Sequence, residues 1–135
     1  MAKRFYSIII PVYNRPEELD ELLESLSKQS WKDFEVLVVE DGSTIKSDIV
    51  AEKYIEELEI RYLFKETTGP GDTRNYGMRN AGADVLLIFD SDCLIPPDYF
   101  EKLENYRNQD DFDAFGGPDK AHDSFSPFQK AISYT

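Results

Sequence analysis

Apolar residues gather in short runs along this chain, and polar turns separate the runs. Runs long enough for a strand occupy residues 5–13, 34–39, 60–64 and 85–89, and a shorter one occupies 112–115. Short unbroken runs followed by polar residues are typical of strands that are buried on both faces of a parallel sheet. Pro11 cannot donate a ladder hydrogen bond, so we expect the first strand to end there.

Helical periodicity fills the intervals between these runs. In the first interval, leucines recur with the spacing of one helical face, at Leu19, Leu22, Leu23 and Leu26. Asn14 is the predicted N-cap of this helix, and Pro16 suits its first turn. Further helices are predicted over about 49–58, from Asp72 or Thr73 to about Ala81, and after 96–98. Strand and helix therefore alternate four times, which predicts one α/β domain over residues 1–135 with a mainly parallel sheet.

The charge of the chain limits its partners. The net charge is −12 and the pI is near 4.4, which argues against nonspecific binding of nucleic acid or anionic membranes. No apolar run approaches the roughly 18 residues of a membrane helix. We therefore expect a cytoplasmic location and no membrane span in this chain, and we leave open membrane association of a full-length protein.

Two carboxylates directly follow the strand predicted at 85–89. Asp90 and Asp92 are alternate residues, so their side chains can converge on one point if the segment is extended. Ligands of parallel sheets gather at the carboxyl ends of strands. Magnesium or manganese usually takes one or two carboxylates together with substrate phosphates, so the pair predicts a divalent-cation site. The alternative is a solvated Asp-x-Asp turn.

Other polar residues follow the remaining strands and are expected on the same rim. Tyr13 offers a flat face for an aromatic base, and Asp41 offers an acceptor for a base or ribose group. Arg74 lies near a predicted helix start, where it can meet a phosphate. The alternatives are that Tyr13 only packs, that Asp41 forms a turn with Gly42, and that Arg74 pairs with a surface acid.

Two common nucleotide-binding motifs are missing. Residues 11–16 read PVYNRP, without the glycines that dinucleotide-binding folds place after their first strand, and no Walker A motif occurs. The sequence therefore argues against a Rossmann dehydrogenase or a P-loop enzyme.

Four motifs in order resemble family 2 glycosyltransferases of the GT-A fold, a Rossmann-like three-layer α/β/α architecture. They are SIIIPVYN at 7–14, VVEDGST at 38–44, TRNYG at 73–77 and FDSD at 89–92. The family transfers a sugar from a nucleotide donor to an acceptor hydroxyl with inversion at the anomeric carbon. The family more usually has Asp-Asp-Gly-Ser where this chain has EDGS at 40–43. The longer side chain of Glu40 argues against a direct contact of this residue with the ligand.

The resemblance implies a role for each candidate residue. Pro11 and Tyr13 would border the base, Asp41 would bond it, and Arg74 would lie near the base or phosphates. Asp90 and Asp92 would hold the metal–diphosphate, with manganese or magnesium as the ion. The implied partners are a nucleoside-diphosphate sugar and a carbohydrate or lipid-linked acceptor, in polysaccharide or glycan synthesis.

Family members continue into an acceptor-binding half that carries a carboxylate base, which an inverting displacement needs. Residues 93–135 contain no motif that resembles this base. We therefore expect a donor half that is truncated at its C-terminus, with the base beyond Thr135. Uncovered apolar residues of the tail, such as Phe125 and Phe128, are expected to favour self-association. A haloacid-dehalogenase-like phosphohydrolase and a non-catalytic nucleotide-sugar-binding module remain alternatives.

Overall fold

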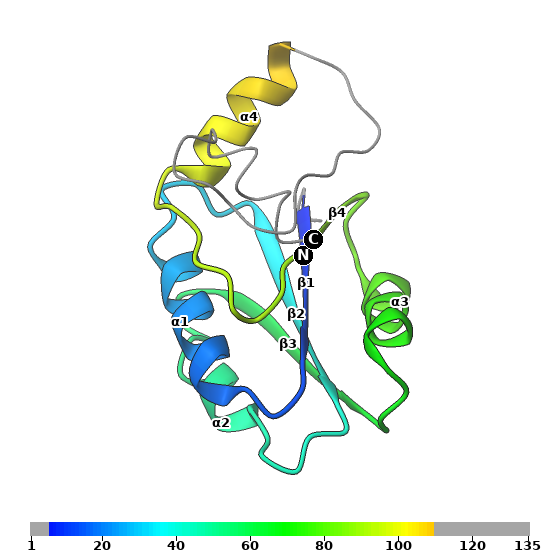
Figure 1. Cartoon of the computed structure of the whole chain (residues 1–135). Helices are drawn as coiled ribbons and strands as arrows, with labels where there is room; N and C mark the ends of the chain where they lie inside the picture. Colours follow the sequence, from blue (N-terminus) through cyan, green and yellow to red (C-terminus); the bar gives the residue numbers. More distant parts are fainter. Residues whose placement is uncertain (1–5, 110–135) are drawn as a thin grey trace.

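The computed structural model describes residues 6–109 of the chain (Figure 1). Strands and helices alternate as predicted. The strands are β1 (Tyr6–Val12), β2 (Phe34–Asp41), β3 (Glu59–Lys65) and β4 (Val85–Ile88). The helices are α1 (Pro16–Ser27), α2 (Asp48–Glu52), α3 (Pro70–Asn80) and α4 (Tyr99–Gln109). The strand predicted at 112–115 and the apolar residues of the tail lie outside the described residues.

The strands form one parallel sheet of four strands, in the order β3-β2-β1-β4. β1 pairs with β2 along its whole length, from Tyr6 opposite Phe34 to Val12 opposite Glu40. All 8 residues of β2 are buried, as the apolar run predicts for a central strand. The mainly parallel α/β sheet expected from the sequence is confirmed.

The prediction that the run at 85–89 is buried on both faces was wrong. β4 ends at Ile88, and within residues 6–109 it pairs only with β1. Leu86 is 37% exposed, although Leu87 is buried. The order of strands in the sheet, which an apolar run does not encode, makes β4 an edge strand of the described sheet.

β1 also runs one residue beyond Pro11, which was predicted to end it. The carbonyl oxygen of Ile9 accepts a hydrogen bond from the N–H of Phe89 at 3.0 Å, so Ile9 directs its backbone groups toward β4. Pro11 lies two residues later and faces the same side. The ladder with β4 has already ended at Ile88 there, so no donor is required from Pro11.

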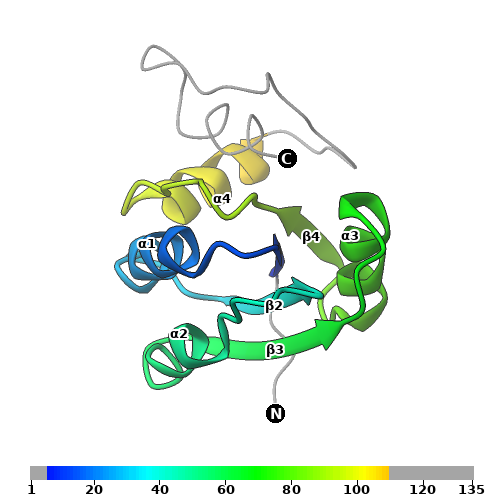
Figure 2. The same ribbon diagram turned by 60° about the horizontal axis from the view of Figure 1, so that its bottom comes forward.

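Helices cover both faces of the sheet, and this gives the expected three layers. α1 and α2 lie on one face and α3 on the other (Figures 1 and 2). Alternate residues of each strand face opposite layers. Ile8 and Ile10 pack in the same core as the leucines of α1. On the other face, Gly77 of α3 lies so close to β1 that an added Cβ would be 2.6 Å from Cγ2 of Ile9.

Three helix boundaries differ from the prediction, those of α1, α2 and α3. The N-cap position of α1 is Arg15 and not Asn14, and no side chain caps this end. Asn14 instead has a φ of 53° and directs its side chain to the loop after β2. α2 ends at Glu52, and turns replace the predicted helix from there to Leu58.

α3 begins at Pro70, before the predicted start, with Gly69 at the N-cap position. Gly69 has a φ of 101°, which favours glycine. Among residues 6–109, no helix combines the length and the apolar character that crossing a membrane requires.

Candidate functional site

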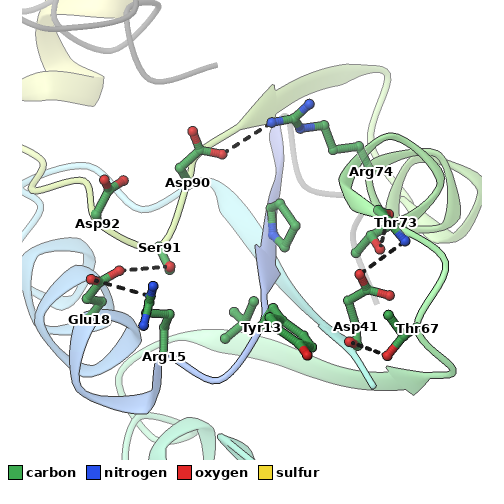
Figure 3. A pocket seen from close by; sticks show the side chains of 13 residues that line it. Tyr13, Arg15, Glu18, Asp41, Thr67, Thr73, Arg74, Asp90, Ser91 and Asp92 are labelled. Atoms are coloured by element: carbon green, nitrogen blue, oxygen red, sulfur yellow. Dashed lines mark hydrogen bonds and ion pairs between the residues drawn. The ribbon is translucent and has the colours of Figure 1, made fainter. Parts of the chain in front are cut away.

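A cleft of about 650 Å³ opens at the carboxyl edge of the sheet (Figure 3). Its lining comes from the ends of β1, β2 and β4, from the start of α1 and from the start of α3. Parallel strands bring their carboxyl ends to the same edge, so residues distant in sequence meet there. All candidate site residues from the sequence line this cleft, namely Pro11, Tyr13, Asp41, Arg74, Asp90 and Asp92.

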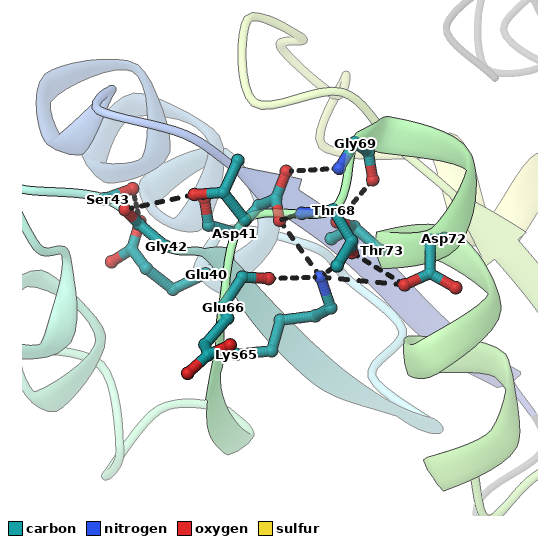
Figure 4. A network of polar contacts seen from close by, with 11 residues as sticks. Glu40, Asp41, Gly42, Ser43, Lys65, Glu66, Thr68, Gly69, Asp72 and Thr73 are labelled. Carbon is teal, nitrogen blue, oxygen red and sulfur yellow. Dashed lines mark hydrogen bonds and ion pairs between the residues drawn. The ribbon is translucent and has the colours of Figure 1, made fainter.

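Asp41 forms one wall of the cleft and is firmly held. Its side chain accepts hydrogen bonds from Nζ of Lys65 at 3.0 Å, from the N–H of Thr68 at 3.0 Å and from the N–H of Gly69 at 3.3 Å (Figure 4). Burial alone would raise the pKa of Asp41, but the Thr68 amide, the Lys65 ammonium and the Thr73 hydroxyl outweigh it and lower the pKa. Asp41 therefore stays ionised and fixed at neutral pH.

Lys65 is a partner that the sequence did not indicate. It lies opposite Asp41 in the β2–β3 pairing, and the two side chains are only 10% and 9% exposed. Lys65 also donates to the carbonyl oxygen of Glu66 at 2.8 Å and to the hydroxyl of Thr68. Only the strand register brings this lysine to the acid, so a motif search could not have found it.

Glu40 and Asp41 are neighbours in sequence but face opposite sides of the sheet. Glu40 is fully buried, and its carboxylate accepts hydrogen bonds from Ser43, Ser47 and Tyr62. It does not line the cleft. The alternation of side chains along a strand explains the difference. The sequence argued against a direct contact between Glu40 and a ligand, and this geometry agrees with that expectation.

Tyr13 presents its ring to the cleft (Figure 3). It is 54% exposed, so the alternative that it serves only as core packing does not hold. Nearby, Gly42 has a φ of 64°, and a Cβ at this position would lie 2.6 Å from the backbone nitrogen of Thr67. Glycine thus allows the loop after Asp41 to pass close to the loop after β3.

Arg74 and Asp90 meet across the cleft from Asp41. An Nη of Arg74 lies 3.5 Å from Oδ1 of Asp90, and the buried Nε of Arg74 has no hydrogen-bond partner among residues 6–109. Burial raises the pKa of Asp90 and the Asp92 carboxylate adds to this, although Arg74 opposes both. This side of the cleft thus keeps an unsatisfied donor beside a poorly compensated acid.

Comparison with known proteins assigns the family. Residues 7–133 match the model of the family described as Glycosyl transferase family 2. The chain belongs to this family. It is 39% identical over 101 residues to validoxylamine A glucosyltransferase of Streptomyces hygroscopicus subsp. jinggangensis, a match covering 72% of this chain and 24% of that protein.

Solved structures of glycosyltransferases share the fold. The crystal structure of Staphylococcus aureus TarS 1-349 in complex with UDP-GlcNAc superposes with a TM-score of 0.79 at 31% identity, covering 90% of this chain and 36% of that one. Mannosyltransferase PcManGT from Pyrobaculum calidifontis, solved with GDP-Man and Mn²⁺, gives a TM-score of 0.70 at 23% identity, covering 79% of this chain and 33% of that one. The GT-A fold expected from the sequence is confirmed.

The match covers only part of each relative. The chain spans between 18% and 24% of the lengths of the first three curated relatives. The region matched by the family model, residues 7–133, contains the cleft and its motifs.

The cleft includes residues that the sequence did not single out for the site. Arg15, Glu18 and Ser91 all line it. The Ser91 hydroxyl donates to Oε2 of Glu18 at 3.3 Å, and Nε of Arg15 lies 3.8 Å from Oε1 of Glu18. The start of α1 thus contacts the turn between Asp90 and Asp92. An acid in the first turn of a helix usually needs no further explanation, so no signal distinguished Glu18.

The turn formed by Asp90, Ser91 and Asp92 can bind a divalent cation that also binds the phosphates of a ligand. Asp92 is exposed and has no hydrogen bond or ion pair within the described part of the chain, and Asp90 has only the long contact with Arg74. No group of three or more His, Cys, Asp or Glu side chains in residues 6–109 could hold a metal by itself. Magnesium and manganese commonly complete such a pair of carboxylates with phosphate oxygens and water, so the donor set fits.

Proposed function

We propose that residues 1–135 form the donor-binding part of an inverting glycosyltransferase that uses a nucleoside-diphosphate sugar. The observation that carries this proposal is the convergence of Pro11, Tyr13, Asp41, Arg74 and the Asp90–Asp92 turn on one cleft. Membership of glycosyl transferase family 2 supports it and argues against the haloacid-dehalogenase-like alternative.

The proposed roles follow from the two sides of the cleft. On one side, Tyr13 stacks on the base and Pro11 borders it, while the fixed carboxylate of Asp41 accepts a hydrogen bond from a base N–H. On the other side, Arg74 binds a phosphate oxygen, leaving its contact with Asp90. The fork of donors of the guanidinium suits bidentate phosphate binding once its contact with Asp90 is released. Asp90 and Asp92 would hold manganese or magnesium, which would neutralise charge on the diphosphate leaving group.

UDP-sugars are the first donors to test, because the TarS structures were solved with UDP and UDP-GlcNAc. The acceptor is proposed to be a carbohydrate or a lipid-linked sugar, in polysaccharide or glycan assembly. The catalytic base and the acceptor site are proposed to lie beyond Thr135, in the part of the relatives that this chain does not match. The cytoplasmic location expected from the sequence stays a prediction.

Calorimetry of the protein with UDP-, GDP- and dTDP-sugars, with and without manganese, tests donor binding. We expect UDP to bind, and to bind at least about tenfold more tightly with manganese, because a charge-assisted contact is worth about 1.5–3 kcal/mol. Asp92→Asn should lose most of this gain and Asp90→Asn somewhat less. Equal affinity with and without the metal would refute the metal role, and no binding of any nucleotide would refute donor binding.

A radiolabelled-donor assay with mixed acceptors separates the enzyme from a non-catalytic binding module. We expect residues 1–135 alone to bind donor without enzyme-like turnover, because loss of a general base costs roughly 10²–10⁴-fold. A longer protein that also includes the part of the relatives that residues 1–135 do not match should transfer sugar. Turnover by residues 1–135 alone would place the base within this chain, and inactivity of the longer protein would favour the binding module.

A further inference from the structure

A chain of hydrogen bonds joins the two loops from which Tyr13 and Asp41 enter the cleft. The backbone N–H of Asn14 donates to Oγ of Ser43 at 2.8 Å, and the Ser43 hydroxyl donates to Oε2 of Glu40 at 2.5 Å. Asn14 directly follows Tyr13, and Glu40 directly precedes Asp41. Each end of the hydrogen-bond chain is therefore the immediate neighbour of a residue assigned to the nucleotide.

Asn14 makes further contacts that hold the two loops together. Its Oδ1 accepts hydrogen bonds from the N–H of Thr44 and of Ile45, both at 2.9 Å, and from the Thr44 hydroxyl at 3.3 Å. Its φ of 53° is a left-handed conformation that asparagine tolerates better than most residues. The side chain thus replaces backbone pairing for the start of the loop after β2.

Glu40 anchors the other end in the body of the protein. Its side chain is fully buried, and Oε1 accepts from the N–H of Ser47 at 2.6 Å and from the hydroxyl of Tyr62 at 3.0 Å. Ser47 precedes α2 and Tyr62 lies on β3, so the carboxylate connects the loop to two elements. Both of its oxygens have donors, as buried polar atoms require.

Nothing comparable holds the Tyr13 side chain itself. Tyr13 is 54% exposed, and its hydroxyl makes no hydrogen bond within residues 6–109. The position of its ring therefore depends on the backbone, and the backbone at this point is held through Asn14. On the same side of the cleft, Asp41 is held independently by Lys65 and the amides of Thr68 and Gly69.

We propose that Asn14 and Glu40 are positioning residues that set Tyr13 at the stacking distance from a base bonded to Asp41, without touching the nucleotide themselves. This inference rests on the proposed nucleotide binding. It assigns a role to the buried acid of the VVEDGST motif that is separate from the role of Asp41. It also explains why the asparagine after Tyr13 is not used as a helix cap.

The test is a double-mutant cycle on UDP affinity. Asn14→Gly removes the side-chain contacts while keeping the φ of 53° accessible, and Glu40→Gln keeps the size of the buried side chain but replaces one acceptor by a donor. Each variant is measured alone and combined with Tyr13→Ala, by calorimetry at saturating manganese. Residues that act through one another show coupling, whereas independent residues add.

We expect Asn14→Gly and Glu40→Gln each to weaken UDP binding at least about threefold when Tyr13 is present, and less than about 1.5-fold in the Tyr13→Ala background. Glu35→Gln is the matched control. Glu35 is 7% exposed and accepts from Ser7, Gly82 and Arg61 at the opposite edge of the sheet. This change should lower the melting temperature and leave UDP affinity unaltered.

The possible outcomes separate the inference from the proposed function. If the unmodified protein binds neither UDP nor UDP-GlcNAc, the proposed function and this inference both fall. If it binds UDP but the Asn14 and Glu40 variants bind equally well, only the positioning role is refuted. Equal weakening with and without Tyr13 would also refute it, because the residues would then act on the whole cleft and not through the tyrosine.

Discussion

The two walls of the cleft differ in how well their acids are satisfied. The Asp41 side chain is 9% exposed and accepts hydrogen bonds from Lys65 and two backbone amides, and its pKa is lowered. Asp90 and Asp92 lie in solvent-accessible positions with one long contact to Arg74, and the pKa of Asp90 is raised. The Asp41 wall is complete without a ligand, whereas on the other wall Arg74 is the one cation in contact with the two carboxylates among residues 6–109, 3.5 Å from Asp90.

This difference suggests a division of labour in donor binding. A fixed, ionised acceptor loses little entropy when it meets a base, so the Asp41 wall is suited to recognition. Asp90, with one long contact, and Asp92, with none among residues 6–109, can bind a cation and the phosphates that come with it. The same kind of residue thus serves two purposes because the surroundings differ.

The largest effect should come from truncating Asp41, and truncating Asp92 on the other wall should have almost none. Asp41→Ala should lower the free energy of unfolding by about 3–5 kcal/mol. It leaves the buried ammonium of Lys65 with only the more distant carboxylate of Asp72, at 3.9 Å, and removes the acceptor of two backbone amides. Asp92→Ala should change it by less than about 0.5 kcal/mol, because Asp92 is exposed. Urea denaturation measures both.

The control for this pair is the double variant Asp41→Leu with Lys65→Met, which removes both charges. It should recover much of the stability lost in Asp41→Ala, since apolar residues can replace a buried ion pair. Similar stability losses from Asp41→Ala and Asp92→Ala would contradict the distinction between the walls.

Nucleotide affinity should separate the walls by their metal dependence. Asp41→Asn should weaken UDP binding by a similar factor with and without manganese, roughly tenfold, because a hydrogen bond to a charged group is lost. Asp92→Asn should weaken it only when manganese is present. Calorimetry of the two variants under both conditions gives the four values. A manganese-dependent loss in Asp41→Asn would indicate that this acid also acts through the metal.

The position of α3 links the two walls, since Thr73 and Arg74 belong to it. Gly77→Ala should destabilise the protein by about 1–3 kcal/mol, because the new Cβ would lie 2.6 Å from a side-chain carbon of Ile9. It should also weaken UDP binding by displacing Arg74. Gly71→Ala is the control on the same helix, because a Cβ there meets nothing within 4 Å. Equal melting temperatures of the two variants would contradict the close packing.

The smallest effect concerns pH. The pKa of Asp41 is lowered by folding, so its contribution to stability is present above its unfolded pKa of about 3.9 and is lost as the pH falls through the lower folded value. The melting temperature should therefore fall as the pH drops below about 4, and Asp41→Asn should make this fall shallower. Scanning calorimetry across this range checks it. Identical pH profiles of the two proteins would show that Asp41 is not stabilised by its partners.

Much of the fold could be predicted because it is encoded in local patterns. The apolar runs and the leucine spacing of α1 identify alternating strands and helices, and alternation restricts the chain to a parallel α/β sheet. The candidate residues could be predicted for the same reason. Once the strands are parallel, residues just after them must meet at one edge, as Tyr13, Asp41 and Asp90 do.

Other features depended on contacts between segments distant in sequence. The run at 85–89 resembles a central strand, but the order of the sheet makes β4 an edge strand in residues 6–109. Asparagine is a favoured N-cap residue, but the side chain of Asn14 accepts hydrogen bonds from Thr44 and Ile45 and does not cap α1. Lys65 reaches Asp41 only through the register of β2 and β3. A local pattern can state which residues are apolar or polar, but strand order, register and side-chain partners are decided by packing energies that arise only when the whole sheet is assembled.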